Sequence, residues 1–261
     1  MTDFAISIFR LFNAKGYSIP QMNIGYIERE TGLEWRITCG GSRAYLVRFG
    51  NQLEDNLDEQ AADSHFMIRR VTSSLLLSGL GLFQAEAMGR LIFKNVCGKV
   101  TWDSHLDGPD PFKKDDSYEE VKKVYDWFGA LCKNNILRRA ADDAHIALTH
   151  PHEALIYVYR GLEWLKEGLV IGWEVIAKDI GVSNNDIRQL KKNANRGTGV
   201  RHATKNGKKL RASFENYTTW VCGLIDAINA ARKRLDSEFK EMTPKEVGDA
   251  VMKATPLLPY P

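Results

Sequence analysis

Hydrophobic and polar residues alternate with a period of two in the first part of the chain. The clearest case is the run 34–39, in which Trp35, Ile37 and Cys39 alternate with charged or polar residues. This alternation is typical of a half-buried β-strand. We therefore expect a β-meander here. Its predicted strands are 22–28, 34–39, 44–49 and one within 83–93, and the run 4–12 fits either a short helix or a strand.

The spacing of apolar residues changes to three and four after position 55. Leu57, Ala61, His65, Ile68 and Val71 predict an amphipathic helix over 55–78, with His65 at the edge of the core. From position 117 onward the pattern is almost wholly helical. The predicted helices are 117–133, 136–148, one starting at 149–153, 172–180, one starting at a capping box of Ser183 and Asp186, and 208–236.

This order of elements predicts an α+β chain with a β-containing N-terminal domain followed by a C-terminal helical bundle. A linker is expected at 106–116, because this stretch combines glycine, prolines and charged residues with little to bury. The predicted organisation is 1–105 as a β-rich domain with one long helix, 106–116 as the linker, 117–240 as the bundle and 241–261 as a mobile tail.

Composition narrows the class of protein. With 44% hydrophobic and 26% charged residues the chain resembles an ordinary globular protein, and its net charge of +3 is small. Its 4 cysteines include no C-x-x-C pair, which favours reduced thiols in a reducing compartment. No segment approaches the roughly 20 apolar residues of a membrane span. We expect a cytoplasmic protein that does not contact a membrane.

Cationic side chains gather between positions 183 and 211, where the only acid is Asp186. A segment that is much more basic than the chain around it favours a polyanionic partner. The expected nucleic-acid-binding residues are Arg188, Lys191, Lys192, Asn195, Lys205, Lys208, Lys209 and Arg211.

Two interpretations of this basic segment remain open from the residues alone. The stretch 177–196 fits a helix-turn-helix, with a turn at Gly181 and a capped second helix, and this predicts DNA binding. The simpler alternative is a solvated basic face on an accessory or interaction protein.

When the stretch is extended to the start of the last predicted helix, it resembles a known protein family. Arg196 is followed after five residues by His202, which itself follows Arg201, just ahead of the last long helix. Here the chain resembles the HEPN superfamily of helical bundles, whose ribonuclease members carry an arginine, a short spacer and a histidine. The Asn195, Arg201 and His202 pattern also resembles MauJ-type proteins. The resemblance spans about 117–236 and departs from the common form at Gly197.

The resemblance implies a protein that acts on RNA, as a metal-independent endoribonuclease working as a homodimer, or as an inactive RNA binder. His202 is suited to proton transfer, and Arg196 or Arg201 to bidentate phosphate binding. Glu163 stands where related domains often carry an acid. The catalytic candidates are therefore Arg196, Arg201, His202 and Glu163. No metal or cofactor is expected, since the spacing of His145, His150 and His152 suits no shared ligand set.

Overall fold

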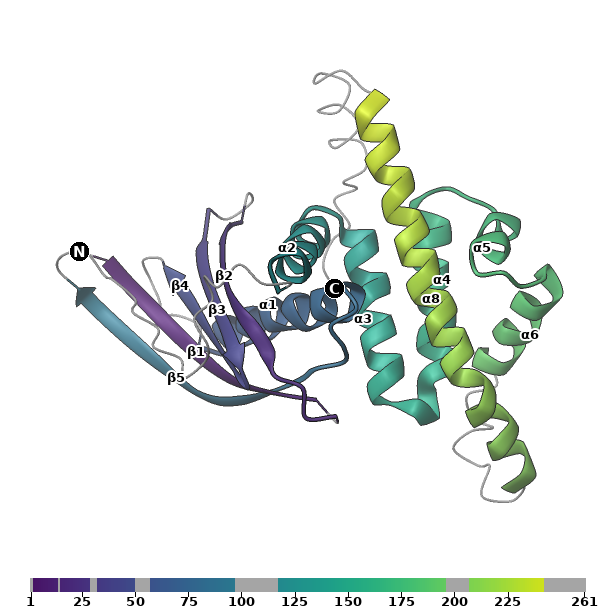
Figure 1. The fold of residues 1–261 in the computed structure, drawn as a ribbon, viewed down its shortest axis with the longest axis horizontal. Helices are drawn as coiled ribbons and strands as arrows, with labels where there is room; N and C mark the ends of the chain where they lie inside the picture. Colours follow the sequence, from purple (N-terminus) through teal and green to yellow (C-terminus); the bar gives the residue numbers. More distant parts are fainter. Residues whose placement is uncertain are drawn as a thin grey trace. The chain divides into compact units, whose positions relative to one another are not determined.

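The structure is a computed structural model that describes residues 2–13, 15–28, 32–49, 57–96, 117–195 and 207–241 of the chain. Its contacts divide the protein into two compact units, Met1–Leu148 and Thr149–Pro261. Among the described residues, the first contains an antiparallel sheet and three helices, and the second is helical (Figure 1). This arrangement confirms the predicted α+β class, with β-structure at the N-terminus and helices at the C-terminus.

In the part of the chain that the structure describes, the sheet has five strands in the order β2-β3-β4-β1-β5. β1 lies between β4 and β5 and pairs antiparallel with both, which explains why the ambiguous run 4–12 forms a strand. Gly41, with φ 58°, and Ser42 join β3 and β4 in a tight turn. The strands are β1 (Thr2–Phe12), β2 (Ile19–Ile27), β3 (Glu34–Gly41), β4 (Arg43–Phe49) and β5 (Gln84–Val96).

One face of the sheet packs against α1 (Leu57–Leu77) and α2 (Ser117–Lys133). Phe9 and Trp35 of the sheet share a core with Val71 of α1 and Phe128 of α2. Phe4, Ile6 and Val47 form a smaller cluster on strands β1 and β4. Side chains from successive positions of β1 thus enter different clusters, as the alternation of a strand requires.

The buried stripe of α1 differs from the predicted one. Ala61 and His65 are exposed, although the His65 ring still meets Phe9 edge-on with centroids 5.3 Å apart. Ser64 is buried instead, and its hydroxyl lies 2.9 Å from that of Ser7 and donates to a backbone carbonyl one turn earlier. A short hydroxyl side chain can be buried when its hydrogen bonds are satisfied in this way, so hydrophobic spacing alone missed it.

Helices α2 and α3 (Asn135–Thr149) belong almost entirely to the first unit, whereas the sequence suggested a bundle that starts at 117. Val124 and Phe128 of α2 are part of the sheet's core. His145 of α3 places Nε2 2.8 Å from the carbonyl oxygen of Phe83. These contacts explain the grouping, and the expected linker 106–116 lies outside the described residues.

The second unit is built around the long helix α8. α8 contacts α4 and α5, and α4 also contacts α6. Val158 and Leu162 of α4 and Leu224 and Ile228 of α8 are fully buried, as their helical spacing predicted. The elements are η1 (Pro151–Glu153), α4 (Ala154–Gly168), α5 (Trp173–Asp179), α6 (Asn184–Asn195) and α8 (Gly207–Glu241). In the described part of the chain, no helix combines the length and apolar character needed to cross a membrane.

The carboxyl group of Asp142, on α3, makes the stability of the protein depend on pH. Burial raises its pKa to about 6 from 3.8, against the attraction of Arg69 and Arg138. The folded state therefore holds this proton to higher pH than the unfolded state, and the free energy of unfolding falls as pH rises through this window. Between about pH 4 and about pH 7, we expect the free energy of unfolding to fall by about 2–3 kcal/mol less in Asp142→Asn than in the wild type. Chemical denaturation at the two pH values measures this difference. The same difference in unfolding free energy between the variant and the wild type at both pH values would contradict this.

Candidate functional site

The predicted helix, turn and capped helix are present in the second unit. α5 and α6 are joined by residues 180–183, and Gly181 has a φ of 70°, which suits glycine best. Ser183 and Asp186 form the predicted capping box. The Ser183 N–H donates to Asp186 Oδ2 over 2.9 Å, and the Asp186 N–H donates to Ser183 Oγ over 3.2 Å. The Ser183 hydroxyl also donates to Asp186 Oδ2 over 2.6 Å, and this hydrogen bond, followed by the one from the Ser183 N–H, lowers the pKa of Asp186.

Helix α6 has two distinct faces. Ile187, Leu190 and Ala194 are buried, at spacings of three and four residues, where α4 and α5 contact the helix. The other positions from Asn184 to Asn193 are exposed. They include Arg188, Lys191 and Lys192, and no carboxylate among the described residues forms an ion pair with these three. We call these three residues the α6 basic face.

An ion pair holds α5 against α8. The Arg234 guanidinium donates from its two terminal nitrogens to the two carboxylate oxygens of Asp179, over 2.7 and 2.5 Å. Asp179 is the last residue of α5, where a negative charge opposes the helix dipole, so Arg234 offsets an unfavourable charge. The hydrogen bonds to Asp179 also raise the pKa of Arg234. No feature of the sequence pointed to this pair, because its members are far apart in the chain.

Glu163, the predicted acidic site residue, lies on the exposed side of α4. Its Oε1 accepts a hydrogen bond of 3.2 Å from the hydroxyl of Tyr159, one turn earlier. The Tyr159 ring stacks on Trp173 of α5, with centroids 5.6 Å apart. Burial, together with the charge of Glu163, raises the pKa of Tyr159 to about 12, so this hydroxyl stays protonated and keeps donating. The ring stack ties the start of α5 to α4, a role that the sequence did not reveal.

The remaining predicted site residues fall between or at the ends of two helices. Arg196, Arg201, His202 and Lys205 lie outside the described residues. Asn195 ends α6, and Lys208, Lys209 and Arg211 belong to the start of α8, but their side chains are not described. The chain thus connects α6 to α8 through the Arg/His segment 196–206, and both helices contact α4, which carries Glu163. That Glu163 and this segment form one site stays a prediction.

Two of the histidines considered as metal ligands have other neighbours. His145 contacts a backbone carbonyl in its own unit, and His150 Nδ1 lies 2.9 Å from the Thr149 hydroxyl. Among the described residues, no group of three or more histidine, cysteine, aspartate or glutamate side chains is arranged to hold a metal ion.

The Asp179 and Arg234 pair predicts a measurable coupling. We expect Arg234→Gln and Asp179→Asn each to lower the free energy of unfolding by about 1.5–3 kcal/mol, because each leaves a half-buried partner without its charge-assisted hydrogen bonds. The double variant should lose less than the sum of the two. Asp236→Asn is the matched control, since Asp236 forms a longer pair of 3.6 Å with Arg232 and is 64% exposed. Additive losses in the double-mutant cycle would show that the pair contributes nothing.

The second unit therefore displays a basic helix face directly ahead of a segment that contains arginines and a histidine. A face of this kind favours polyanions, because like charges on it are not neutralised by the protein. Comparisons of the chain with protein-family models, with curated proteins and with solved structures give no match. Its function is accordingly inferred from its own residues and their geometry.

Proposed function

We propose that the second unit binds RNA through the α6 basic face and the residues that follow it, and that the Arg/His segment cleaves this RNA without a metal ion. The observation that carries the proposal is the exposure of Arg188, Lys191 and Lys192 immediately ahead of Asn195 and Arg196. A cationic side chain without a protein partner is available to bind a phosphate. This binding is favourable because it releases the phosphate's counterions.

The chemistry assigned to the segment follows from its residue types. Cleavage of RNA by its own 2′-hydroxyl needs a base for that proton, an acid for the leaving oxygen and cations at the phosphate. His202 supplies one proton transfer, and Arg196 or Arg201 binds the phosphate in a bidentate manner. One histidine is too few for both proton transfers. A homodimer in which two copies of the segment face one RNA would supply the second.

The position of the Arg/His segment supports RNA as the polyanion. It connects α6 to α8, and both helices pack against α4. An arginine and histidine segment beside a bundle helix is what the resemblance to the HEPN superfamily implies. Glu163, held by Tyr159 on α4, is the acidic candidate in that bundle.

A second candidate, binding of duplex DNA, is favoured by the turn between α5 and α6. Gly181 and the capping box of Ser183 and Asp186 produce a helix-turn-helix connection. The first exposed residues of α6 include Asn185, Arg188 and Gln189, which are side chains that read adenine and guanine edges in the major groove.

RNA cleavage tests the proposal. We expect the purified protein to cut single-stranded RNA in the presence of a metal chelator, and His202→Ala to cut at least about 100-fold more slowly while still binding RNA. Replacing Arg188, Lys191 and Lys192 together by alanine should weaken binding and reduce the slope of log affinity against log salt by about 2. Lys233→Ala, which removes an exposed cation of α8, is the control and should change neither.

Gln189→Ala separates the two candidates. An uncharged amide contributes little to phosphate binding, so RNA affinity should be unchanged in this variant. If instead duplex DNA binds more tightly than RNA and Gln189→Ala weakens only the DNA complex, the helix-turn-helix is the functional element. Equal cutting by the wild type and by His202→Ala would exclude His202 as the catalytic group.

A further inference from the structure

The first unit places a half-buried thiol beside a buried guanidinium. Cys132 lies in the last turn of α2 and is half-buried, whereas Cys39 is buried and Cys222 is exposed. Arg70, on α1, donates from Nη1 to the Cys132 sulfur over 3.9 Å. The hydroxyl of Tyr26, on β2, also hydrogen-bonds to this sulfur. One thiol on α2 thus receives donors from both α1 and β2.

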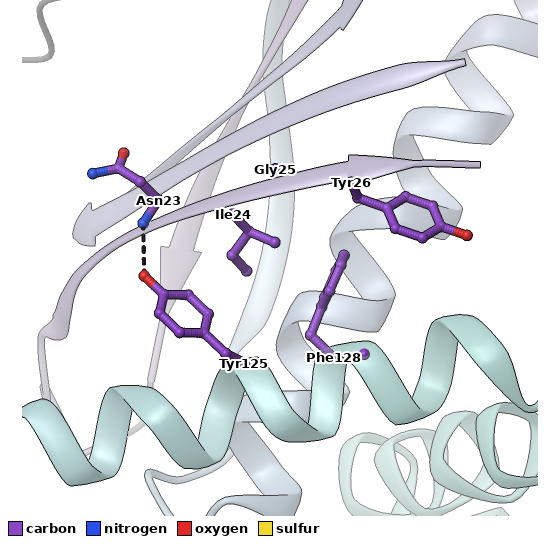
Figure 2. Close-up of a pocket in the computed structure, with 7 residues that line it drawn as sticks. Asn23, Ile24, Gly25, Tyr26, Tyr125 and Phe128 are labelled. Atoms are coloured by element: carbon purple, nitrogen blue, oxygen red, sulfur yellow. Dashed lines mark hydrogen bonds between the residues drawn. The ribbon is translucent and has the colours of Figure 1, made fainter. Parts of the chain in front are cut away.

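Tyr26 reaches the thiol across the surface of α2. Its ring meets that of Phe128 edge-on, with centroids 5.9 Å apart. Cys132 lies one helical turn beyond Phe128, on the same side of α2. Figure 2 shows Tyr26 and Tyr125 on opposite sides of Phe128. The Tyr125 hydroxyl accepts a hydrogen bond of 3.1 Å from the Asn23 N–H, so the two tyrosine hydroxyls serve different partners (Figure 2).

Arg70 is a buried cation without a counter-ion. It is 9% exposed. Among the described residues, no carboxylate forms an ion pair with it, and its Nε atom is buried without a hydrogen-bond partner. A buried charge is costly unless it is paired and hydrogen-bonded. The reduced thiol of Cys132 is only a weak acceptor, so it leaves most of this cost in place.

The charges around the thiol favour an anion at this position. The charged groups that act on Cys132 are the guanidiniums of Arg70 and Arg138. Asp142 interacts with Arg70, but less strongly than with Arg138, and Glu28 acts on the tyrosine hydroxyl instead. Burial raises the pKa of Cys132 against the attraction of both guanidiniums, so the reduced sulfur is neutral near pH 7. Both cations would gain from a negatively charged oxygen on this sulfur.

We propose that Cys132 is an oxidation site, at which hydrogen peroxide converts the thiol to a sulfenic acid whose oxygen is held by Arg70 and Tyr26. The sulfur attacks one peroxide oxygen, an S–O bond forms and the O–O bond breaks. The second oxygen takes up the thiol proton and leaves as water, so sulfur is oxidised and peroxide is reduced. In its anionic form the new oxygen gives Arg70 the acceptor that it lacks. The site belongs to the first unit and is independent of the function proposed for the second.

The sheet offers no second thiol close to this position. In the register of β2 and β3, Tyr26 pairs with Trp35, whereas Cys39 pairs with Met22, four residues further along β2. Cys39 therefore lies about 13 Å along the sheet from the Tyr26 pair, too far for a disulfide with Cys132. Within the described residues of the first unit, the sulfenic acid therefore has no thiol with which to condense.

Peroxide treatment of the full-length protein, followed by labelling with a dione that reacts with sulfenic acids and by peptide mass spectrometry, tests the site. We expect a label on Cys132 that still forms after catalase has removed the peroxide. The oxidation rate should rise with pH, because the thiolate is the nucleophile and burial raises the pKa of Cys132. Tyr26→Phe should shorten the half-life of the sulfenic acid at least about 5-fold, because the oxygen loses one donor. Tyr125→Phe is the matched control and should leave the half-life unchanged, since this hydroxyl pairs with Asn23.

Two substitutions of Cys132 test the need for an anion without any oxidant. Cys132→Asp places a carboxylate beside Arg70, and Cys132→Asn places an amide of nearly the same shape there. We expect the aspartate variant to have the higher melting temperature at pH 7, because Arg70 gains a counter-ion. In a half-buried site without an unpaired cation, the amide would be the more stable. The proposal is overturned if Cys132 takes no label, if the label is lost equally fast in the wild type and Tyr26→Phe, or if Cys132→Asn is the more stable variant.

Discussion

The direction in which α6 presents its cations depends on the burial of three side chains. Ile187, Leu190 and Ala194 pack where α4 and α5 contact α6. A helix with one narrow apolar stripe has a single favourable orientation against its neighbours, because any rotation would expose the stripe and bury charge. The opposite face, with Arg188, Lys191 and Lys192, must then point to solvent. The proposed binding of a polyanion follows from this packing constraint.

Two polar arrangements hold α5 and α6 so that this face is formed before a ligand arrives. The capping box of Ser183 and Asp186 satisfies the first amides of α6, and Arg234 anchors the end of α5 to α8. The ring stack of Tyr159 and Trp173 fixes the other end of α5. A preformed surface costs less conformational entropy on binding than a surface that must be ordered by its ligand.

Sequence periodicity predicted the elements better than their partners. The strand 34–41 and the helix 117–133 begin where their patterns indicated, because period two and period 3.6 are set locally. The same patterns do not say which surface an apolar face meets. Helix α2 was therefore expected in the bundle although it covers the sheet, and the run 4–12 was ambiguous until its pairing with two neighbours was known.

For the candidate site too, the sequence predicted what local spacing determines and missed the contacts between helices. The capping box follows from local spacing and is confirmed. Arg188, Lys191 and Lys192 are exposed, and their binding of nucleic acid stays a prediction. Tyr159 and Trp173 were missed because aromatic residues on helices read as ordinary core, and Asp179 with Arg234 because an ion pair between distant residues leaves no periodic signal. The roles of Arg196, Arg201 and His202 concern residues outside the described part of the chain and stay predictions.

Photo-crosslinking of single-stranded RNA that contains 4-thiouridine to the full-length protein, followed by mass-spectrometric mapping of the crosslinked peptides, tests the central claim most directly. Crosslinks confined to peptides from 184 to 211, and lost when Arg188, Lys191 and Lys192 are replaced by alanine, are the predicted result. Crosslinks that persist in this variant, or that map to the sheet of the first unit, would show that the α6 basic face does not bind RNA.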